Sequence, residues 1–360
     1  SMAAIETKKL KLQTNFMRLL LILFTGLVLL SIPFAGGAQR NTSTNTMFRF
    51  YEDNDFINLR GSGTDEAYTN GTRLDIFYEK ENANKKFLNR WMPKAGKNAI
   101  NTYGWGIMQL MYTPRDISTS LSAPKDYNYA GALFAIKSLH SSNARKKYSL
   151  HTELYLGTIG PNSFAKESQI AIHKLINYQR PNGWDNQVSS KFVLNINLTA
   201  EKMLFQKNNS IELIGGSKIM AGTMTNAISL YSLLRVGKMN PYFNGFINRY
   251  HTATIKSNAE QWQANVIFRP VIEYQFFNTL ISGNRIKNNS NKAETDVVKS
   301  EISAKPVPNH FIYGFDYGFS LTCNTTTLAI TQKVESAAIQ GVRHHEVGNI
   351  LFLKNLQCNL

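Results

Sequence analysis

The distribution of apolar residues after position 38 is the strongest constraint on how this chain can fold. No apolar run beyond that position approaches the roughly 20 residues that a membrane-spanning helix needs. Instead, segments of about ten residues with alternating apolar and polar character recur, and polar turns separate them. Alternation with a period of two is typical of strands that are apolar on one face. The sequence therefore predicts an all-β protein.

About twelve such segments are present, an even number that can close into a barrel without free edges. Tyrosines occur at many of the segment ends, as they do where amphipathic rings lie at both membrane interfaces. A soluble β-sandwich would also use tyrosines, but the pattern favours a transmembrane antiparallel β-barrel. The predicted strands are Met47 to Asp55, Tyr68 to Tyr78, Tyr103 to Tyr112, Tyr129 to Leu139, Tyr148 to Leu156, Lys191 to Phe205, Ile211 to Thr223, Ile228 to Val236, Ala264 to Ile281, His310 to Leu321, Thr326 to Val334 and Val347 to Leu353.

The first 38 residues have the character of a secretion signal. Arg18 precedes an uncharged run from Leu19 to Phe34, and small residues follow as far as Ala38. This run is short for a membrane span, and the small residues suit cleavage near Ala38, although an uncleaved anchor helix is the alternative. We expect a signal peptide over residues 1–38, a short linker over 39–45 and an outer-membrane barrel over 46–360.

The chain is strongly basic and poor in cysteine. Its formal net charge is +16, and residues 1–38 hold four basic residues and one acidic residue, so the remainder keeps +13. Nucleic acid, anionic lipid and lipopolysaccharide phosphate would all complement this charge, so charge alone does not choose between them. The sequence contains only two cysteines, Cys323 and Cys358. This number excludes a disulfide framework and a cysteine zinc site, but a single bridge between the two remains open.

One stretch interrupts the β pattern. From Pro161 to Tyr178, apolar residues recur at helical spacings, and Gln169 and His173 stand four residues apart. We expect a short helix in a loop between two strands, over the barrel mouth or against its rim. A lone loop histidine is usually solvated or packed, but its place on an amphipathic helix near an apolar wall makes His173 a candidate general base.

The first predicted hairpin gathers oxygen donors. Asp53, Asn54 and Asp55 close the first strand, and Tyr68, Thr69, Asn70 and Gly71 open the second, so hairpin pairing brings them together. Carboxylate, amide and hydroxyl oxygens are hard ligands that suit Ca²⁺, which tolerates irregular geometry. The alternative is an Asx turn with exposed acids. Asp55 and Asn54 are the candidate metal ligands.

Five motif blocks in order resemble the lipid A 3′-O-deacylase family of outer-membrane barrels. The similarity runs from about Phe48 to Phe205 and more weakly to Gly237. A single Asn-Asp pair would be an unspecific signal, whereas five blocks in the right order after a secretion signal are specific. The blocks are Asn54-Asp55; Tyr68-Thr69-Asn70-Gly71; Met111-Tyr112-Thr113-Pro114 with Asp116-Ile117; Asp126 with Tyr129-Ala130-Gly131; and Gly160-Pro161, Gln169, His173 and Gly183-Trp184-Asp185-Asn186-Gln187.

This resemblance implies a barrel of about twelve strands whose site lies between the outer wall and an extracellular-loop helix. His173 falls on the family's general-base histidine, and Asn54, Asp55 and Thr69 fall on its other active-site positions. The implied reaction is hydrolysis of the 3′-linked acyl ester of lipid A by water that His173 deprotonates, with Ca²⁺ stabilising the oxyanion. The implied partners are lipid A or lipopolysaccharide and outer-membrane lipids, with no nucleic acid. We expect a monomer, although the sequence leaves a dimer open.

Three departures from the family pattern stand out. Gln179 occupies a site position where the family can carry a glutamate, and it cannot supply a negative charge to support an imidazolium. Tyr127 and Asn128 stand where Arg-Pro is common. The chain ends in Gln357 to Leu360 instead of a terminal aromatic residue, which questions the register of the last strand.

Two other functions remain open at this point. A catalytically inactive barrel would be a lipopolysaccharide-binding scaffold or a small pore, and Gln179 is the feature that favours it. An outer-membrane phospholipase would use the same base and cation, but it would normally pair a serine with a histidine, and no motif supports such a serine.

Overall fold

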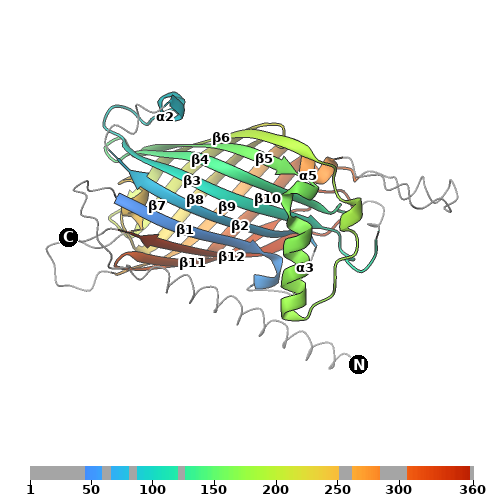
Figure 1. The fold of residues 1–360 in the computed structure, drawn as a ribbon. Helices are drawn as coiled ribbons and strands as arrows, with labels where there is room; N and C mark the ends of the chain where they lie inside the picture. The colour runs from blue at the N-terminus through green and yellow to red at the C-terminus, as the bar shows by residue number, and fades with distance from the viewer. Residues whose placement is uncertain are drawn as a thin grey trace, which may run out of the picture.

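The computed structural model describes residues 45–58, 66–80, 87–120, 126–250, 262–283 and 306–356. In these residues, twelve antiparallel strands close into one barrel, each paired with its neighbours in sequence and the first with the last (Figure 1). This confirms the predicted fold class and strand number. The predicted signal peptide, most of the linker and residues 357–360 lie outside the described residues.

All twelve predicted segments coincide with strands. The ninth ends at Asn278, before the predicted Ile281, because the Asn278 side chain caps a helical turn by accepting a hydrogen bond from the Leu280 backbone. The strands are β1 (Asn45–Asn54), β2 (Ala67–Glu79), β3 (Ile100–Thr113), β4 (Ala130–Asn143), β5 (Tyr148–Ile159), β6 (Lys191–Lys207), β7 (Ile211–Gly222), β8 (Thr225–Lys238), β9 (Trp262–Asn278), β10 (Phe311–Cys323), β11 (Thr326–Glu335) and β12 (His345–Asn355). The helices are η1 (Asp55–Ile57), α2 (Phe87–Trp91), η3 (Pro161–Ser163), α3 (Ala165–Ile176), η4 (Trp184–Asn186), α4 (Phe246–Arg249) and α5 (Thr279–Ser282).

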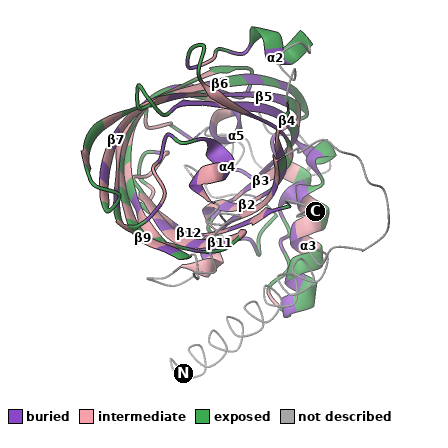
Figure 2. Ribbon diagram, turned by 90° about the vertical axis from the view of Figure 1, so that its left-hand side faces the viewer, coloured by how far each residue is buried: buried purple, intermediate pink, exposed green. Residues whose placement is uncertain are grey.

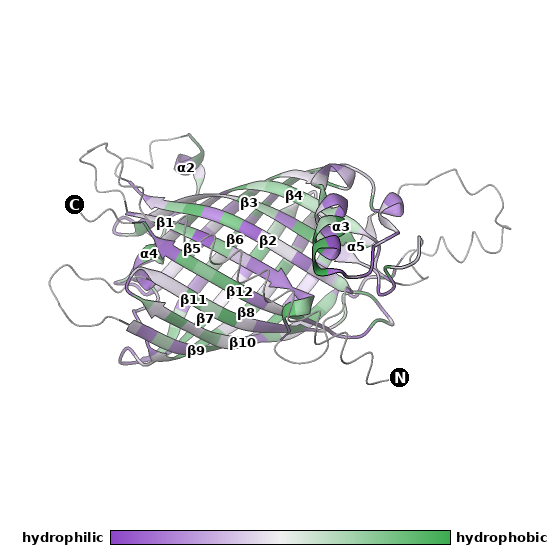
Figure 3. Ribbon diagram, turned by 60° about the horizontal axis from the view of Figure 1, so that its bottom comes forward, coloured by the Kyte–Doolittle hydropathy of each residue, from purple (hydrophilic) through white to green (hydrophobic). Residues whose placement is uncertain are grey.

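Hydrophobic and hydrophilic residues alternate along the strands (Figure 3), which gives the wall an apolar outer face and a polar inner face. On β2 and β3, outward-facing Leu74, Ile76, Trp105 and Ile107 are 39–53% exposed. Inward-facing residues such as Arg73 are buried in the barrel. This is the pattern of a barrel whose outside contacts lipid hydrocarbon. No helix formed by the described residues is long and apolar enough to cross a membrane.

The two ends of the barrel differ in their connections. Tight turns over residues 144–147, 208–210 and 324–325 join strands at the end that holds the start of β1. The other end carries α3, α5 and most of the longer connections. Since outer-membrane barrels have short periplasmic turns and longer extracellular loops, we call these the periplasmic and the extracellular end.

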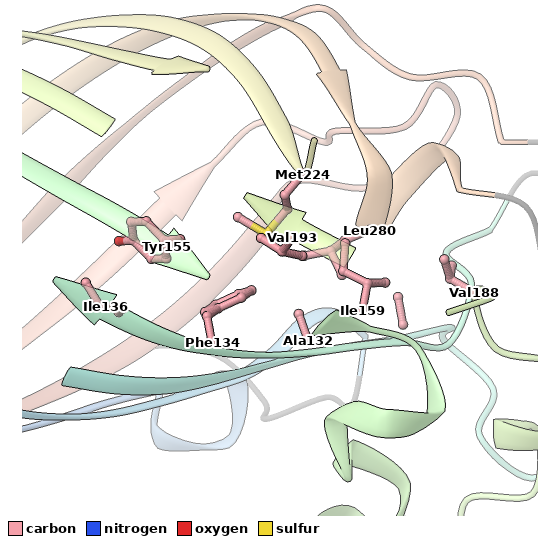
Figure 4. Packing of buried hydrophobic residues seen from close by; sticks show 10 residues of the cluster. Ala132, Phe134, Ile136, Tyr155, Ile159, Val188, Val193, Met224 and Leu280 are labelled. Carbon is pink, nitrogen blue, oxygen red and sulfur yellow. The ribbon is translucent and has the colours of Figure 1, made fainter. Parts of the chain in front are cut away.

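The barrel interior holds two short helices, one near each end. Figure 2 shows α4 and α5 inside the ring of strands. At the extracellular end, Leu280 of α5 packs in an apolar cluster with Phe134 and Val193 (Figure 4). At the periplasmic end, Phe246 of α4 stacks on His140 with ring centroids 3.8 Å apart. The interior is therefore packed at both ends.

Buried ion pairs link the strands inside the barrel. Arg73 on β2 bonds Asp75 on its own strand at 2.9 Å and Glu153 on β5 at 2.7 Å. Removing the guanidinium would leave two carboxylates buried without this cation, a change that costs about 3–5 kcal/mol in other proteins.

We therefore expect Arg73→Ala to lower barrel stability by about that amount, which the temperature of the heat-dependent mobility shift in detergent gels would measure. Lys166→Ala is the control, because it breaks an exposed ion pair with Asp185 (2.6 Å) and should cost less than about 1 kcal/mol. Equal shifts for the two variants would contradict the structural role of Arg73.

Candidate active site

A polar patch interrupts the apolar outer face near the extracellular end. The strand register places Glu52 opposite Thr72, Thr72 opposite Gln109, and Asn54 opposite Asn70. One row closer to the periplasm, the same outward positions hold apolar residues. Polar side chains that face hydrocarbon are costly, so this surface must be covered or hydrated. We call these five residues the outer-wall polar patch.

Glu52 is the centre of this patch. It is 7% exposed, and its two carboxylate oxygens accept hydrogen bonds from Asn70 Nδ2 (2.5 Å) and Thr72 Oγ1 (2.7 Å). Glu52 and Thr72 are not among the site residues predicted from the sequence. The strand alternation contained the signal, because both fall on the outward set that Phe48, Phe50 and Leu74 otherwise occupy.

Helix α3 lies outside the barrel wall, beside the patch (Figures 1 and 2). Gln109 of the patch donates to the carbonyl oxygen of Ser163 at 2.7 Å, just before the helix begins. Gly131 on β4 allows close approach, because a Cβ there would lie 2.4 Å from Cβ of Ala165. The predicted loop helix is confirmed, and it docks on the wall rather than over the barrel mouth.

The loop after α3 fastens the helix to the wall. Trp184 is buried, and its indole nitrogen donates to Gln169 Oε1 at 2.7 Å. Its ring packs on Tyr129, and a Cβ at Gly183 would lie 2.3 Å from the same Tyr129 ring, so only glycine fits there. The strongest sequence block is therefore explained by helix docking. Gln169 Nε2 and Gln187 Oε1 are both buried without a hydrogen-bond partner among the described residues.

His173 lies near the end of α3 and is 5% exposed. Asn177 follows in the left-handed conformation (φ 57°), which ends the helix and turns the chain back. This turn places the backbone carbonyl of Gln179 2.6 Å from His173 Nδ1. A carbonyl only accepts, so Nδ1 carries the proton and the lone pair of the neutral ring is on Nε2. The oriented imidazole therefore does not depend on the side chain at position 179.

His173 and the first hairpin meet at Tyr178. The Tyr178 ring lies edge-on to His173, with centroids 5.0 Å apart, and to Phe56 at 6.2 Å. Phe56 directly follows Asp55 in η1, so the structure brings the loop helix and the predicted oxygen donors to one part of the surface.

The three predicted hairpin residues have different surroundings. Asn54 Oδ1 accepts from Phe56 N at 2.9 Å, so the Asx turn that we considered as an alternative does form. Its acid is not exposed, however: Asp55 is 1% exposed, and its carboxylate accepts from Glu66 N at 3.0 Å. Thr69 lies in a β-bulge of β2, and its hydroxyl oxygen is 2.6 Å from the hydroxyl oxygen of Thr113.

A network inside the barrel holds the end of β1 in place behind these residues. Asp53 Oδ2 accepts from the Tyr51 hydroxyl (2.7 Å), the Tyr68 hydroxyl (3.0 Å) and Lys333 Nζ (2.6 Å). Asn349 on β12 donates to the other carboxylate oxygen at 2.8 Å. The turn that carries Asn54 and Asp55 therefore starts from a strand that β2, β11 and β12 all brace.

The donor atoms near Asp55 are chemically suited to calcium. Carboxylate and carboxamide oxygens are its usual protein ligands. Among the described residues, no group of three or more His, Cys, Asp or Glu side chains could hold a metal. Asp55 and Asn54 fit a calcium ion only together with backbone, hydroxyl or water oxygens.

The other departures from the family pattern have structural explanations or lie outside the described residues. Tyr127 is buried against the loop between β11 and β12, where its hydroxyl accepts a hydrogen bond from Ala338 N at 3.2 Å. Burial raises the pKa of Tyr127 to about 12, so this phenol stays neutral. Asn128 is buried beside it. Cys323 is exposed, and Cys358 is not described.

Comparison with known proteins places this architecture in one family. The family model described as outer membrane protein LpxR matches residues 20–356. LpxR from Salmonella typhimurium has a similar fold, with a TM-score of 0.66, 12% identity, and coverage of 86% of this chain and 99% of that one. The β domain of the Bordetella autotransporter BrkA and the translocator domain of NalP from Neisseria meningitidis match with TM-scores of only 0.40 and 0.37.

The BrkA match has 8% identity and covers 87% of this chain and 99% of the other, and the NalP match has 9% identity and covers 88% and 89%. These similarities are too weak to carry an argument. No curated protein matches the sequence. The family match spans all twelve strands of the barrel, and the fold agrees with it. The chain therefore belongs to the LpxR family, a lipid A deacylase family of the bacterial outer membrane.

Proposed function

We propose that this protein hydrolyses the 3′-linked acyl ester of lipid A at the outer-wall polar patch. The observation that carries the proposal is the place of His173, a buried and oriented imidazole on the membrane-facing side of the barrel. A lipid substrate can reach this surface laterally from the outer leaflet. The barrel interior is separated from the surrounding lipid by the closed wall of strands, and α4 and α5 lie within it.

His173 is the general base in this reaction. Nε2 takes a proton from water as the water oxygen attacks the ester carbonyl. The Gln179 carbonyl accepts from Nδ1–H and so favours the imidazolium that forms. The imidazolium then returns its proton to the departing sugar oxygen, which yields a free fatty acid and a 3′-hydroxyl. No covalent acyl-enzyme is required.

Asp55 would bind calcium, with Asn54 as a second ligand and Thr69 as an orienting group. When bound, Ca²⁺ supplies a fixed positive charge that stabilises the oxyanion of the tetrahedral intermediate. The buried carboxylate of Asp55 is the charge that such a cation would balance.

The apolar surface below the patch suits the substrate's acyl chains. One row closer to the periplasm than Glu52, Thr72 and Gln109, the wall presents an outward row of Phe50, Leu74 and Ile107. A lipid whose ester group lies at the outer-wall polar patch would therefore keep its acyl chain in the hydrocarbon of the membrane. Lys174 and Arg180 are exposed near His173, and their charges suit the phosphates of lipid A. A monomer that does not bind nucleic acid remains our expectation.

Expression of the protein in an outer-membrane host should remove the 3′-linked acyl or acyloxyacyl group from lipid A, as mass spectrometry would show. Chelation of calcium in isolated membranes should stop this loss, and added calcium should restore it, because the oxyanion would otherwise lack its positive partner. A folded, heat-modifiable barrel with unchanged lipid A would favour an inactive scaffold. Release of fatty acid from glycerophospholipid alone would favour the phospholipase alternative.

His173→Ala should lower the deacylation rate at least about 100-fold, the usual contribution of a general base, and leave the barrel folded. His310→Ala is a matched control, since its Nδ1 lies 2.7 Å from the backbone carbonyl of Gln275 at the same end of the barrel. His310 lies away from the patch, so this variant should keep its activity. Turnover by the His173 variant at the wild-type rate would exclude the proposed base.

Glu52→Gln should lower kcat/KM by about ten- to a hundredfold, because charge-assisted hydrogen bonds of about 1.5–3 kcal/mol orient Asn70 and Thr72 in the patch. Glu79→Gln is the matched control, since Glu79 also accepts from an asparagine amide and a threonine hydroxyl, but at the periplasmic end. Equal activity losses for the two variants would indicate a general effect on the barrel and contradict a local role of Glu52.

A further inference from the structure

In the connection between β2 and β3, residues 92–95 lie against the outside of the barrel at its periplasmic end. Met92 packs against Tyr103 and Leu139, which both belong to the outward-facing set of the wall. The next turn is held by hydrogen bonds from Ala95 N to Ser141 Oγ (2.8 Å) and from Asn143 Nδ2 to the Ala95 carbonyl (2.7 Å). This connection is therefore fixed beside the lipid-facing wall.

Helix α2, which precedes this anchor, exposes its apolar side chains. Phe87 is 76% exposed, Trp91 75% and Leu88 40%, whereas polar Asn89 is buried. Figure 2 shows α2 beyond the ring of strands. A helix in water would turn these residues inward, and exposed aromatic rings at the end of a membrane barrel are typical of the interface between hydrocarbon and headgroups.

Exposed cations lie next to α2. Arg90 and Lys97 belong to the same connection, and Arg145 and Lys146 lie on the adjacent tight turn between β4 and β5. In the part of the chain that the structure describes, none of these four residues forms an ion pair with a carboxylate. The sequence from residue 82 to residue 115 contains no acidic residue at all.

We propose that α2 and the turn over residues 144–147 form a docking surface for the phospholipids of the inner leaflet, with a preference for anionic headgroups. The aromatic residues of α2 continue the lipid-facing surface of β3, where Trp105 is 51% exposed. The cations complement headgroup phosphates, each contributing about 1 kcal/mol near an anionic membrane. A protein partner is less well matched, since it would have to order these long side chains on a single surface. The surface would fix the depth of the barrel in the membrane, and this role is independent of the proposed deacylation.

The depth of α2 can be measured in the full-length protein reconstituted in nanodiscs. In a Cys323→Ser/Cys358→Ser background, nitroxide labels are placed at Phe87→Cys and Trp91→Cys. Asn98→Cys, which is exposed in the same connection, is the aqueous reference. Labels at 87 and 91 should collide more often with oxygen than with a water-soluble nickel complex, and the label at 98 should do the reverse. Equal behaviour at all three positions would overturn the proposal, and so would labels at 87 and 91 that neither reagent reaches, because a protein contact would then cover them.

The headgroup preference has its own measurement. A bimane label at Trp91→Cys should be quenched more strongly by brominated phosphatidylglycerol than by brominated phosphatidylcholine at equal mole fraction. The variant Arg145→Gln/Lys146→Gln should reduce this preference by roughly fivefold for each cation that contacts a headgroup. Equal quenching by the two lipids in the unsubstituted protein would contradict anionic recognition. Deacylase activity enters neither measurement, so failure here and failure of the proposed function can be told apart.

Discussion

Hydrocarbon tolerates almost no polar surface, and this constraint organises the whole molecule. It makes the chain close its strands into a barrel, since every backbone group must be paired within the wall. It also makes the outward face of β1, β2 and β3 apolar, except where Glu52, Thr72 and Gln109 line up across the three strands. That exception is the location of the candidate active site. A lipid ester and a water molecule can meet only at such a boundary, where hydrocarbon ends and covered polar groups begin.

The site depends on both sides of the wall. Outside, Gly131 and the Trp184–Gln169 hydrogen bond hold α3 against the strands, so that His173 has a fixed position. Inside, Asp53 joins Lys333, Tyr51 and Tyr68 and steadies the strand end that leads into Asn54 and Asp55. Rigid strands thus carry the outer-wall polar patch and support the loop helix that bears His173.

The sequence predicted the strands well because alternation with a period of two is a direct consequence of the wall's two environments. The helix over Ala165–Ile176 was predicted for a similar reason, since its apolar residues follow a helical period. The surroundings of the site were harder. Asp55 is buried, and its carboxylate accepts a hydrogen bond from the backbone N–H of Glu66, eleven residues away. No local sequence pattern predicts that contact. Glu52 could have been recognised as a polar residue in an apolar outward row, but only once the register was known.

Position 179 shows how a main-chain group can take over what a sequence comparison assigns to a side chain. The His173 ring is oriented by a carbonyl oxygen, and every residue type supplies one. What this contact demands is the reversal at Asn177, where the left-handed backbone favours asparagine or glycine. Relatives with unlike side chains six residues after the histidine can therefore retain the same tautomer. Surveys that sort active from inactive members should first compare the backbone conformation at position 177, and only then the side chain at position 179.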